Sequence, residues 1–227
     1  MKNLGLIILC GMLFVNFAVH AQDCTYYFPT KVGASLEMKT YSAKDKLTGS
    51  SKSKILENSG NSVKFESEVF DDKGKSLSKG TMEVKCENGE FVLDMKSYFS
   101  SVDLSKYKDM DVKIDAKNMT IPAKLQAGQK LNDGEITIKI STGGFTIMNM
   151  STKVTNRNVV GFEDITTPAG TFKCAKITSD IDSKVMVKVK SKVTEWISEK
   201  VGTVRVESYD QKDKLVSYTV LAAYNQY

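Results

Sequence analysis

Alternation of apolar and polar residues runs through most of the chain. In residues 63–69 (VKFESEV), Val63, Phe65 and Val69 share one parity, while lysine and glutamate occupy the other. Residues 135–140 (EITIKI) repeat the pattern with three isoleucines. A period of two, rich in β-branched side chains, is typical of antiparallel strands with one buried face. The chain is therefore predicted to consist mainly of such strands.

Short segments rich in glycine, asparagine and aspartate separate these runs, as in residues 87–90 (ENGE) and 132–135 (NDGE). Such residues accept a positive φ or cap their own backbone, so they favour hairpin turns. Residues 167–170 (TPAG) are interpreted as a turn of this kind and not as a binding loop. Pro168 presets φ at the first corner, and Gly170 takes the left-handed conformation.

Thirteen strands are expected, and helix is expected to be scarce. A single helical turn is predicted at residues 103–110, with Asp103 as its N-cap. The expected strands are residues 35–42, 52–58, 61–70, 79–87, 90–97, 110–118, 135–141, 145–156, 158–167, 171–182, 184–197, 201–210 and 213–224.

The resulting prediction is an all-β fold, an antiparallel meander that forms a curved sandwich, half-barrel or barrel. Residues 22–227 are expected to form a single β-rich domain. An alternative is two β halves joined by a crossover near residues 119–134, where Pro122 and Gly128 interrupt the alternation.

The first 21 residues have the features of a secretory signal peptide. Lys2 precedes an almost wholly apolar run, and small residues lead up to Ala21, after which we expect cleavage. We therefore expect an exported protein, periplasmic or secreted. Neither Cys10 nor Cys24 follows the small apolar triplet of a lipoprotein signal, so no lipid anchor is expected. No later segment approaches the roughly 20 apolar residues of a membrane span, so no transmembrane segment is expected in the mature chain.

Three cysteines, Cys24, Cys86 and Cys174, remain after the predicted cleavage. An oxidising compartment permits disulfides, but an odd number allows one intrachain pair at most, and the sequence leaves the pairing open. No CxxC motif is present, so neither a zinc knuckle nor a redox pair is predicted.

The only histidine, His20, lies within the predicted leader. The mature chain would therefore lack the residue that serves most often in proton transfer and nucleophile activation. We predict a non-enzymatic protein with no cofactor and no metal site. A glycosidase that uses two carboxylates is a less favoured alternative. The neighbours Glu163 and Asp164 would face opposite sides of a strand and could not converge on one bond.

The formal net charge is +5, and lysines alternate with acidic residues along the chain. Arg157 and Arg205 are the only arginines. Because readers of nucleic acid depend on arginine forks and clustered basic faces, no nucleic-acid partner is expected.

Residues 145–150 (FTIMNM) are apolar on both faces of the expected strand. This pattern fits either a central core strand or the lining of a cavity, for which methionine is well suited. Trp196, the only tryptophan, is either a packing residue or a stacking platform. The candidate lining of an apolar ligand site is Phe145, Ile147, Met148, Met150 and Trp196.

Four stretches resemble one known family. They are residues 23–49, 119–135 (MTIPAKLQAGQKLNDGE), 159–177 (VVGFEDITTPAGTFKCAKI) and 194–208 (TEWISEKVGTVRVES). Together they resemble the DUF3108-like family, some members of which are labelled TapB-like, of exported Gram-negative proteins. The resemblance implies a β-rich exported protein with no established activity, and it assigns no catalytic residue.

The leading hypothesis is an exported, non-catalytic β-protein that acts in the envelope as a binding or carrier module for an apolar ligand or a lipoprotein. The alternative is a structural or interaction protein of the cell envelope or surface. The expected partner is accordingly a lipid or an envelope protein.

Overall fold

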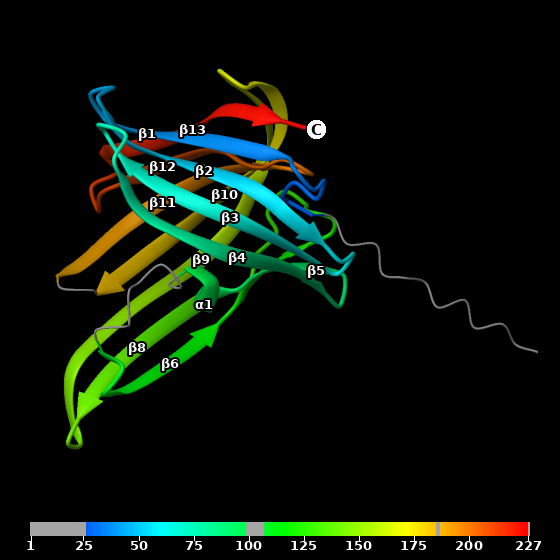
Figure 1. Ribbon diagram of the computed structural model, residues 1–227. Helices are drawn as coiled ribbons and strands as arrows, with labels where there is room; N and C mark the ends of the chain where they lie inside the picture. Colours follow the sequence, from blue (N-terminus) through cyan, green and yellow to red (C-terminus); the bar gives the residue numbers. More distant parts are fainter. Residues whose placement is uncertain (1–25, 99–106, 185–186, 227) are drawn as a thin grey trace, which may run out of the picture.

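The computed structural model describes residues 26–98, 107–184 and 187–226, and the predicted signal peptide lies outside them (Figure 1). Within these residues, thirteen strands form one antiparallel sheet. Their bounds are β1 (Ser35–Ser42), β2 (Leu47–Asn58), β3 (Ser62–Asp71), β4 (Ser76–Glu87), β5 (Glu90–Leu93), β6 (Asp111–Lys117), β7 (Met119–Pro122), β8 (Gly134–Thr142), β9 (Phe145–Thr167), β10 (Gly170–Lys184), β11 (Lys188–Ser198), β12 (Gly202–Tyr209) and β13 (Leu215–Asn225). The helix α1 (Met95–Tyr98) has four residues. The all-β prediction is confirmed.

The sheet curls into a nearly closed barrel (Figure 1). Its strand order is β6-β8-β9-β10-β11-β12-β13-β1-β2-β3-β4-β5-β7. The strands β6 and β7 follow each other in the chain but stand at opposite ends of this order. The segment predicted as a crossover, residues 119–134, therefore begins with β7 at one end of the sheet and leads to β8 near the other.

The connection after β7 lies along β9 and helps to close the barrel. The amide of Gly128 donates to the carbonyl of Val159 at 2.7 Å, and the amide of Val159 donates to the carbonyl of Gln129 at 2.9 Å. The amide of Leu131 donates to the carbonyl of Arg157 at 2.9 Å. In the described residues, backbone hydrogen bonds thus tie the segment after β7 to β9, the third strand from the opposite end of the sheet.

Three strand predictions are wrong in detail. Residues 145–156 and 158–167 are one strand, β9, because Asn156 takes a φ of 54° at an irregularity and the strand continues beyond it. Asparagine tolerates this left-handed conformation better than most residues. Residues 90–97 divide into β5 and α1. The short strand β7 was not expected, because a proline argues against a strand. Pro122 is tolerated in β7 because β7 is an edge strand.

The turn at residues 167–170 is confirmed. Thr167 pairs with Gly170 across the β9–β10 hairpin, and Gly170 has a φ of 130°. The predicted helical turn at residues 103–110 lies partly outside the described residues, as does its N-cap Asp103.

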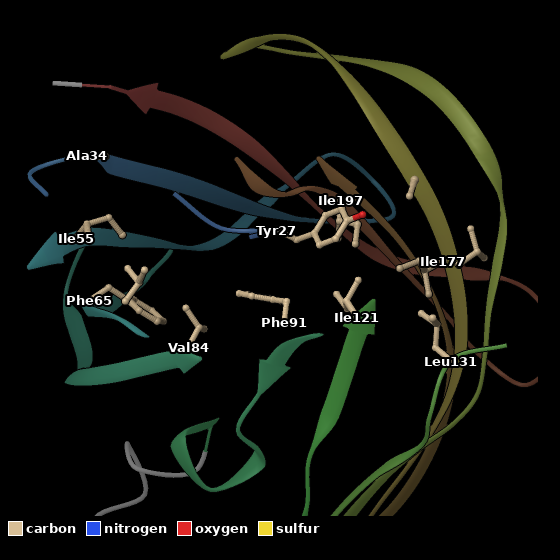
Figure 2. Close-up of a cluster of buried hydrophobic side chains, with 13 residues drawn as sticks. Tyr27, Ala34, Ile55, Phe65, Val84, Phe91, Ile121, Leu131, Ile177 and Ile197 are labelled. Atoms are coloured by element: carbon tan, nitrogen blue, oxygen red, sulfur yellow. The ribbon is translucent and has the colours of Figure 1, made fainter. Parts of the chain in front are cut away.

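The barrel interior is filled by aliphatic and aromatic side chains, here called the barrel cluster (Figure 2). Its buried members are Tyr27, Ala34, Ile55, Val63, Phe65, Val84, Phe91, Ile121, Leu131, Val159, Ala175, Ile177 and Ile197. Residues before β1 contribute to it, because the ring centroid of Phe28 lies 4.5 Å from that of Phe65 and the ring of Tyr27 meets Phe91 edge-on. These aromatic contacts anchor the N-terminal segment inside the barrel.

Candidate functional site

The five residues predicted to line an apolar site do not come together. Met148 and Met150 lie on the inner face of β9, where Met150 is 7% exposed. Phe145 and Ile147, near the β8–β9 turn, are 78% and 50% exposed. Trp196 is 6% exposed and belongs to a separate cluster with Cys174, Val204 and Leu221. The structure therefore separates Trp196 from the methionines.

Met148 and Met150 belong to a larger methionine-rich cluster in a part of the molecule that we call the wing. The wing consists of β6, β8 and residues 145–154 of β9, and it extends away from the other strands (Figure 1). The buried members of this wing cluster are Met95, Ile136, Ile138, Ile140 and Met150. Its partly buried members are Tyr107, Met110, Val112, Ile114, Ala116, Met119, Met148 and Val154.

Strand register places the wing cluster on one face of the sheet. Ile138 pairs with Met150 on one side and with Ile114 on the other. Directly opposed residues share a face, so the cluster extends across three strands. Residues between these positions, such as Lys113 and Lys139, therefore point to the opposite, polar face. The wing is amphipathic, and its apolar face is the one that α1 contacts through Met95.

Gly134 makes room for two methionines at the start of β8. A Cβ added there would lie 2.3 Å from Cγ of Met119 and 3.4 Å from Sδ of Met95. The first distance is shorter than real Cβ contacts allow, so any larger residue would displace Met119. The sequence suggested a turn role for this glycine, but its function in the structure is close packing.

A polar clamp beside the wing cluster holds the crossover in place. The Asn118 carboxamide accepts a hydrogen bond from the amide of Met95 at 3.1 Å, and Nδ2 of Asn132 donates to the Asn118 carbonyl at 2.9 Å. Nη1 of Arg157, from β9, donates to the carbonyls of Thr120 at 3.2 Å and Asn132 at 2.8 Å.

Arg157 is 5% exposed, so these carbonyls replace water around its charge. This role could not be predicted from the sequence, because the partners of Arg157 lie in a segment without alternating apolar residues.

Trp196 is held by a network of charged groups on its own face of the sheet. Its Nε1 donates to Oε1 of Glu163 at 2.6 Å, and Nζ of Lys176 lies 3.2 Å from the same oxygen and 5.1 Å from the tryptophan ring centroid. The hydrogen bonds from Trp196 and then Lys176 lower the pKa of Glu163. A glycosidase general acid needs a raised pKa, so Glu163 is poorly suited to that role.

Of the two cysteines in the described residues, one forms a disulfide and the other is a free thiol. Cys86 is disulfide-bonded, whereas Cys174 is free and buried, so the bridge does not join these two. Cys24 lies outside the described residues. Burial raises the pKa of the Cys174 thiol to about 11, which keeps it protonated and unreactive near neutral pH.

Other kinds of site receive no support in the described ranges. Among residues 26–98, 107–184 and 187–226, no group of three or more His, Cys, Asp or Glu side chains is placed to hold a metal ion. In the same ranges, no helix has the length and apolarity to cross a membrane. A surface pocket of about 470 Å³ is lined mainly by polar side chains of β9, β10 and β11, including Asn156, Asp180 and Lys192, and by none of the five predicted residues.

The solved structures that are similar to this chain include two proteins of matching length. A presumed lipoprotein from Parabacteroides distasonis ATCC 8503 is 28% identical, with a TM-score of 0.72, over 89% of this chain and 100% of that chain. A presumed exported protein with a YmcC-like fold from Bacteroides fragilis NCTC 9343 is 25% identical, also with a TM-score of 0.72 and the same coverage. No curated protein matches the chain. The model of the DUF3108-like family matches residues 31–221, which include every strand from β1 to β12. The chain therefore belongs to the DUF3108-like family.

Proposed function

We propose that this protein is an exported, non-catalytic binding module of the cell envelope that holds an amphiphile with one acyl chain against the apolar face of the wing. Export is supported by the apolar N-terminal leader and by the two structural relatives, which are described as a lipoprotein and an exported protein. Loss of the only histidine with that leader supports a non-catalytic role.

The observation that carries the proposal is the incomplete burial of the wing cluster. Eight of its members in the described residues are only partly buried, and five of its members are methionines. Unbranched, polarisable methionine side chains adapt to ligands of irregular shape. An acyl chain would cover apolar surface that the protein leaves in contact with water.

Exposed valines near the start of β11 lie on the same side of the sheet as the wing cluster. Val189 pairs with Ser183, Ser183 with Thr152, and Thr152 with Ile136, so Val189 shares the face of the wing cluster. Val189 is 55% exposed and Val187 is 74% exposed.

Val189 thus adds an exposed apolar strip beside the wing cluster. Lys184 and Lys188 have the opposite parity and point to the other face of the sheet, where Lys188 forms an ion pair with Asp182 at 3.3 Å. The apolar strip therefore matches the acyl chain of a ligand and not its head group.

Calorimetric titration with three twelve-carbon amphiphiles tests this proposal. The three are dodecanoate, dodecyl phosphate and dodecyltrimethylammonium. All three should bind, with affinities that differ by less than about tenfold, or about 1.4 kcal/mol, because the acyl chain makes the contact. Absence of binding for all three, or binding that depends on the head group alone, would overturn the proposal.

A matched pair of variants locates the site. Val189→Glu places a negative charge on the apolar strip and should weaken dodecanoate binding by about tenfold or more. Leu77→Glu makes the same kind of change on β4, where Leu77 is 63% exposed, and should leave binding unchanged. Equal effects of the two variants would place the ligand elsewhere.

A second candidate function, an interaction protein of the envelope, is favoured by a different observation. The sheet has two terminal strands, β6 and β7, because the barrel does not close through a strand ladder. Terminal strands present unpaired backbone groups to other chains. Crosslinking in intact envelopes would distinguish the functions, since an interaction protein should yield one stoichiometric protein partner.

A further inference from the structure

The strand β6 forms one end of the sheet and carries an unusual charge pattern. In the described part of the chain, its ladder is with β8 alone. Its seven residues (DVKIDAK) alternate between exposed and partly buried positions. The exposed positions hold Asp111, Lys113, Asp115 and Lys117, which alternate in sign.

This pattern is complementary to itself when two copies of β6 run antiparallel. If Ile114 of one copy faces Ile114 of the other, Lys113 faces Asp115 and Asp111 faces Lys117, each twice by symmetry. Directly opposed residues of unlike charge stabilise an antiparallel pair, and like charges destabilise it. The same register pairs Val112 with Ala116, so apolar residues also face apolar residues.

Neighbouring registers do not share this property. When the register is shifted by two residues in one direction, Lys113 faces Lys113 of the other copy and Asp111 faces Asp115. When it is shifted in the other direction, Asp115 faces Asp115 and Lys113 faces Lys117. Both shifts therefore bring like charges together. A shift of one residue sets the apolar face of one strand beside the polar face of the other. A parallel arrangement in register opposes every charge to its like, and one offset by two residues opposes unlike charges but is not two-fold symmetric. Among two-fold symmetric pairings, the sequence of β6 therefore favours the register centred on Ile114.

We propose that β6 is a self-association edge, through which two copies of this chain join in a two-fold symmetric dimer. Two-fold dimers are the commonest oligomers, and their interfaces must be complementary to themselves. The joined strands would form one sheet in the order β9-β8-β6-β6-β8-β9, with the two wing clusters adjacent on one face. A second copy is the occupant favoured here because it supplies the complementary charges by itself.

The charged residues are free to form the new pairs. Lys113 and Asp115 are 69% and 61% exposed in their side chains, and their own ion pair within the strand is long, at 3.7 Å. A seven-residue edge buries little area, so the dimer should be weak and concentration-dependent. This proposal does not rest on the amphiphile site, and its test is performed without any amphiphile.

Charge-swap variants measured by sedimentation velocity, from micromolar to millimolar protein, test the proposal. The parent protein should form a dimer as its concentration rises. In the Lys113→Asp variant, the new aspartate faces Asp115 of the other copy, twice by symmetry. In the Asp115→Lys variant, the new lysine faces Lys113 of the other copy, again twice. Each should weaken self-association by about tenfold or more. An equimolar mixture of these two variants restores every unlike pair and should regain the dimer.

Two controls complete the design. The double variant Lys113→Asp with Asp115→Lys restores the pattern within one chain and should dimerise like the parent. Lys44→Asp, in the turn between β1 and β2, changes net charge equally and should not affect dimerisation. Circular dichroism checks that each variant is folded. A parent protein that stays monomeric at millimolar concentration would overturn the proposal, as would single variants that associate like the parent or a mixture that fails to regain the dimer.

Discussion

The barrel cluster and the wing cluster are both apolar, yet they are packed differently. In the described residues, the barrel cluster has thirteen buried members and five partly buried ones, whereas the wing cluster has five buried members and eight partly buried ones. Branched and aromatic side chains dominate the first, and methionine is prominent in the second. Close packing of rigid side chains produces a unique core, and methionine produces an adaptable one. The comparison indicates that the barrel interior is the main source of stability, whereas the incomplete burial of the wing is what the proposed binding role requires.

The largest effect is expected for removal of a side chain from the barrel. Phe91 is 1% exposed and meets Tyr26 and Tyr27 edge-on. Phe91→Ala should lower the free energy of unfolding by about 3–5 kcal/mol, because it removes buried area and leaves a cavity. Urea denaturation followed by circular dichroism measures the change. A loss below about 1 kcal/mol would mean that the barrel interior is not the main source of stability.

The next effect concerns the disulfide. Since Cys174 is free and Cys86 is bonded, we predict that peptide mapping under non-reducing conditions will recover a Cys24–Cys86 peptide. Cys86→Ser should destabilise the protein by about 2–4 kcal/mol. Cys174 should remain unlabelled by iodoacetamide until the protein unfolds. Rapid labelling of Cys174 in the native state would contradict its burial.

A smaller effect is expected for Gly134→Ala in the wing. The new methyl group would meet Met119 at a distance shorter than contact allows, and the expected loss of stability is about 1–3 kcal/mol. Met119→Ala should relieve part of this loss when the two changes are combined. Strictly additive losses in the double variant would show that Met119 is not the obstacle.

The smallest effect involves Glu163. Its pKa is lowered in the folded state, so the stability that it contributes is present above its ordinary value of 4.5 and is lost as the pH falls through the lower, folded value. Glu163→Gln should therefore be slightly less stable than the parent at neutral pH and equally stable in acid. Thermal unfolding over this pH range measures the difference, which is small because the Glu163 side chain is 45% exposed and its interactions are screened by water. A difference that grows as the pH falls would contradict the assignment.

The alternation of apolar and polar residues predicted most strands. It could not predict where a strand continues through an irregularity or which distant strands pair. The prediction of two strands around residue 157 failed because Asn156 accepts a left-handed φ without ending β9. The four residues of β7 are too few to show a period, and their role depends on a partner strand, β5, that is distant from them in sequence. Gly134 was interpreted from its turn-like neighbours, whereas its role depends on Met119 and Met95.

The sequence indicates two members of the wing cluster but not the others. Met148 and Met150 lie in one apolar run, whereas Met95, Met110 and Met119 lie in other segments and join them only in the fold. Trp196 was predicted to line the site because its ring could stack on a ligand. In the structure, Glu163 and Lys176 contact that ring instead. Exposure of Phe145 could not be predicted, since apolar residues at a hairpin tip resemble those of a buried strand.

Methionine methyl signals test the division between wing and barrel most directly. Protein labelled with ¹³C at the methionine methyl groups would be titrated with dodecanoate and followed by two-dimensional NMR. The account predicts shifts for the five wing methionines and none for Met38 and Met82, which pack against the other clusters. The wing methionines are Met95, Met110, Met119, Met148 and Met150. Shifts confined to Met38 and Met82, or no shifts at saturating dodecanoate, would contradict it.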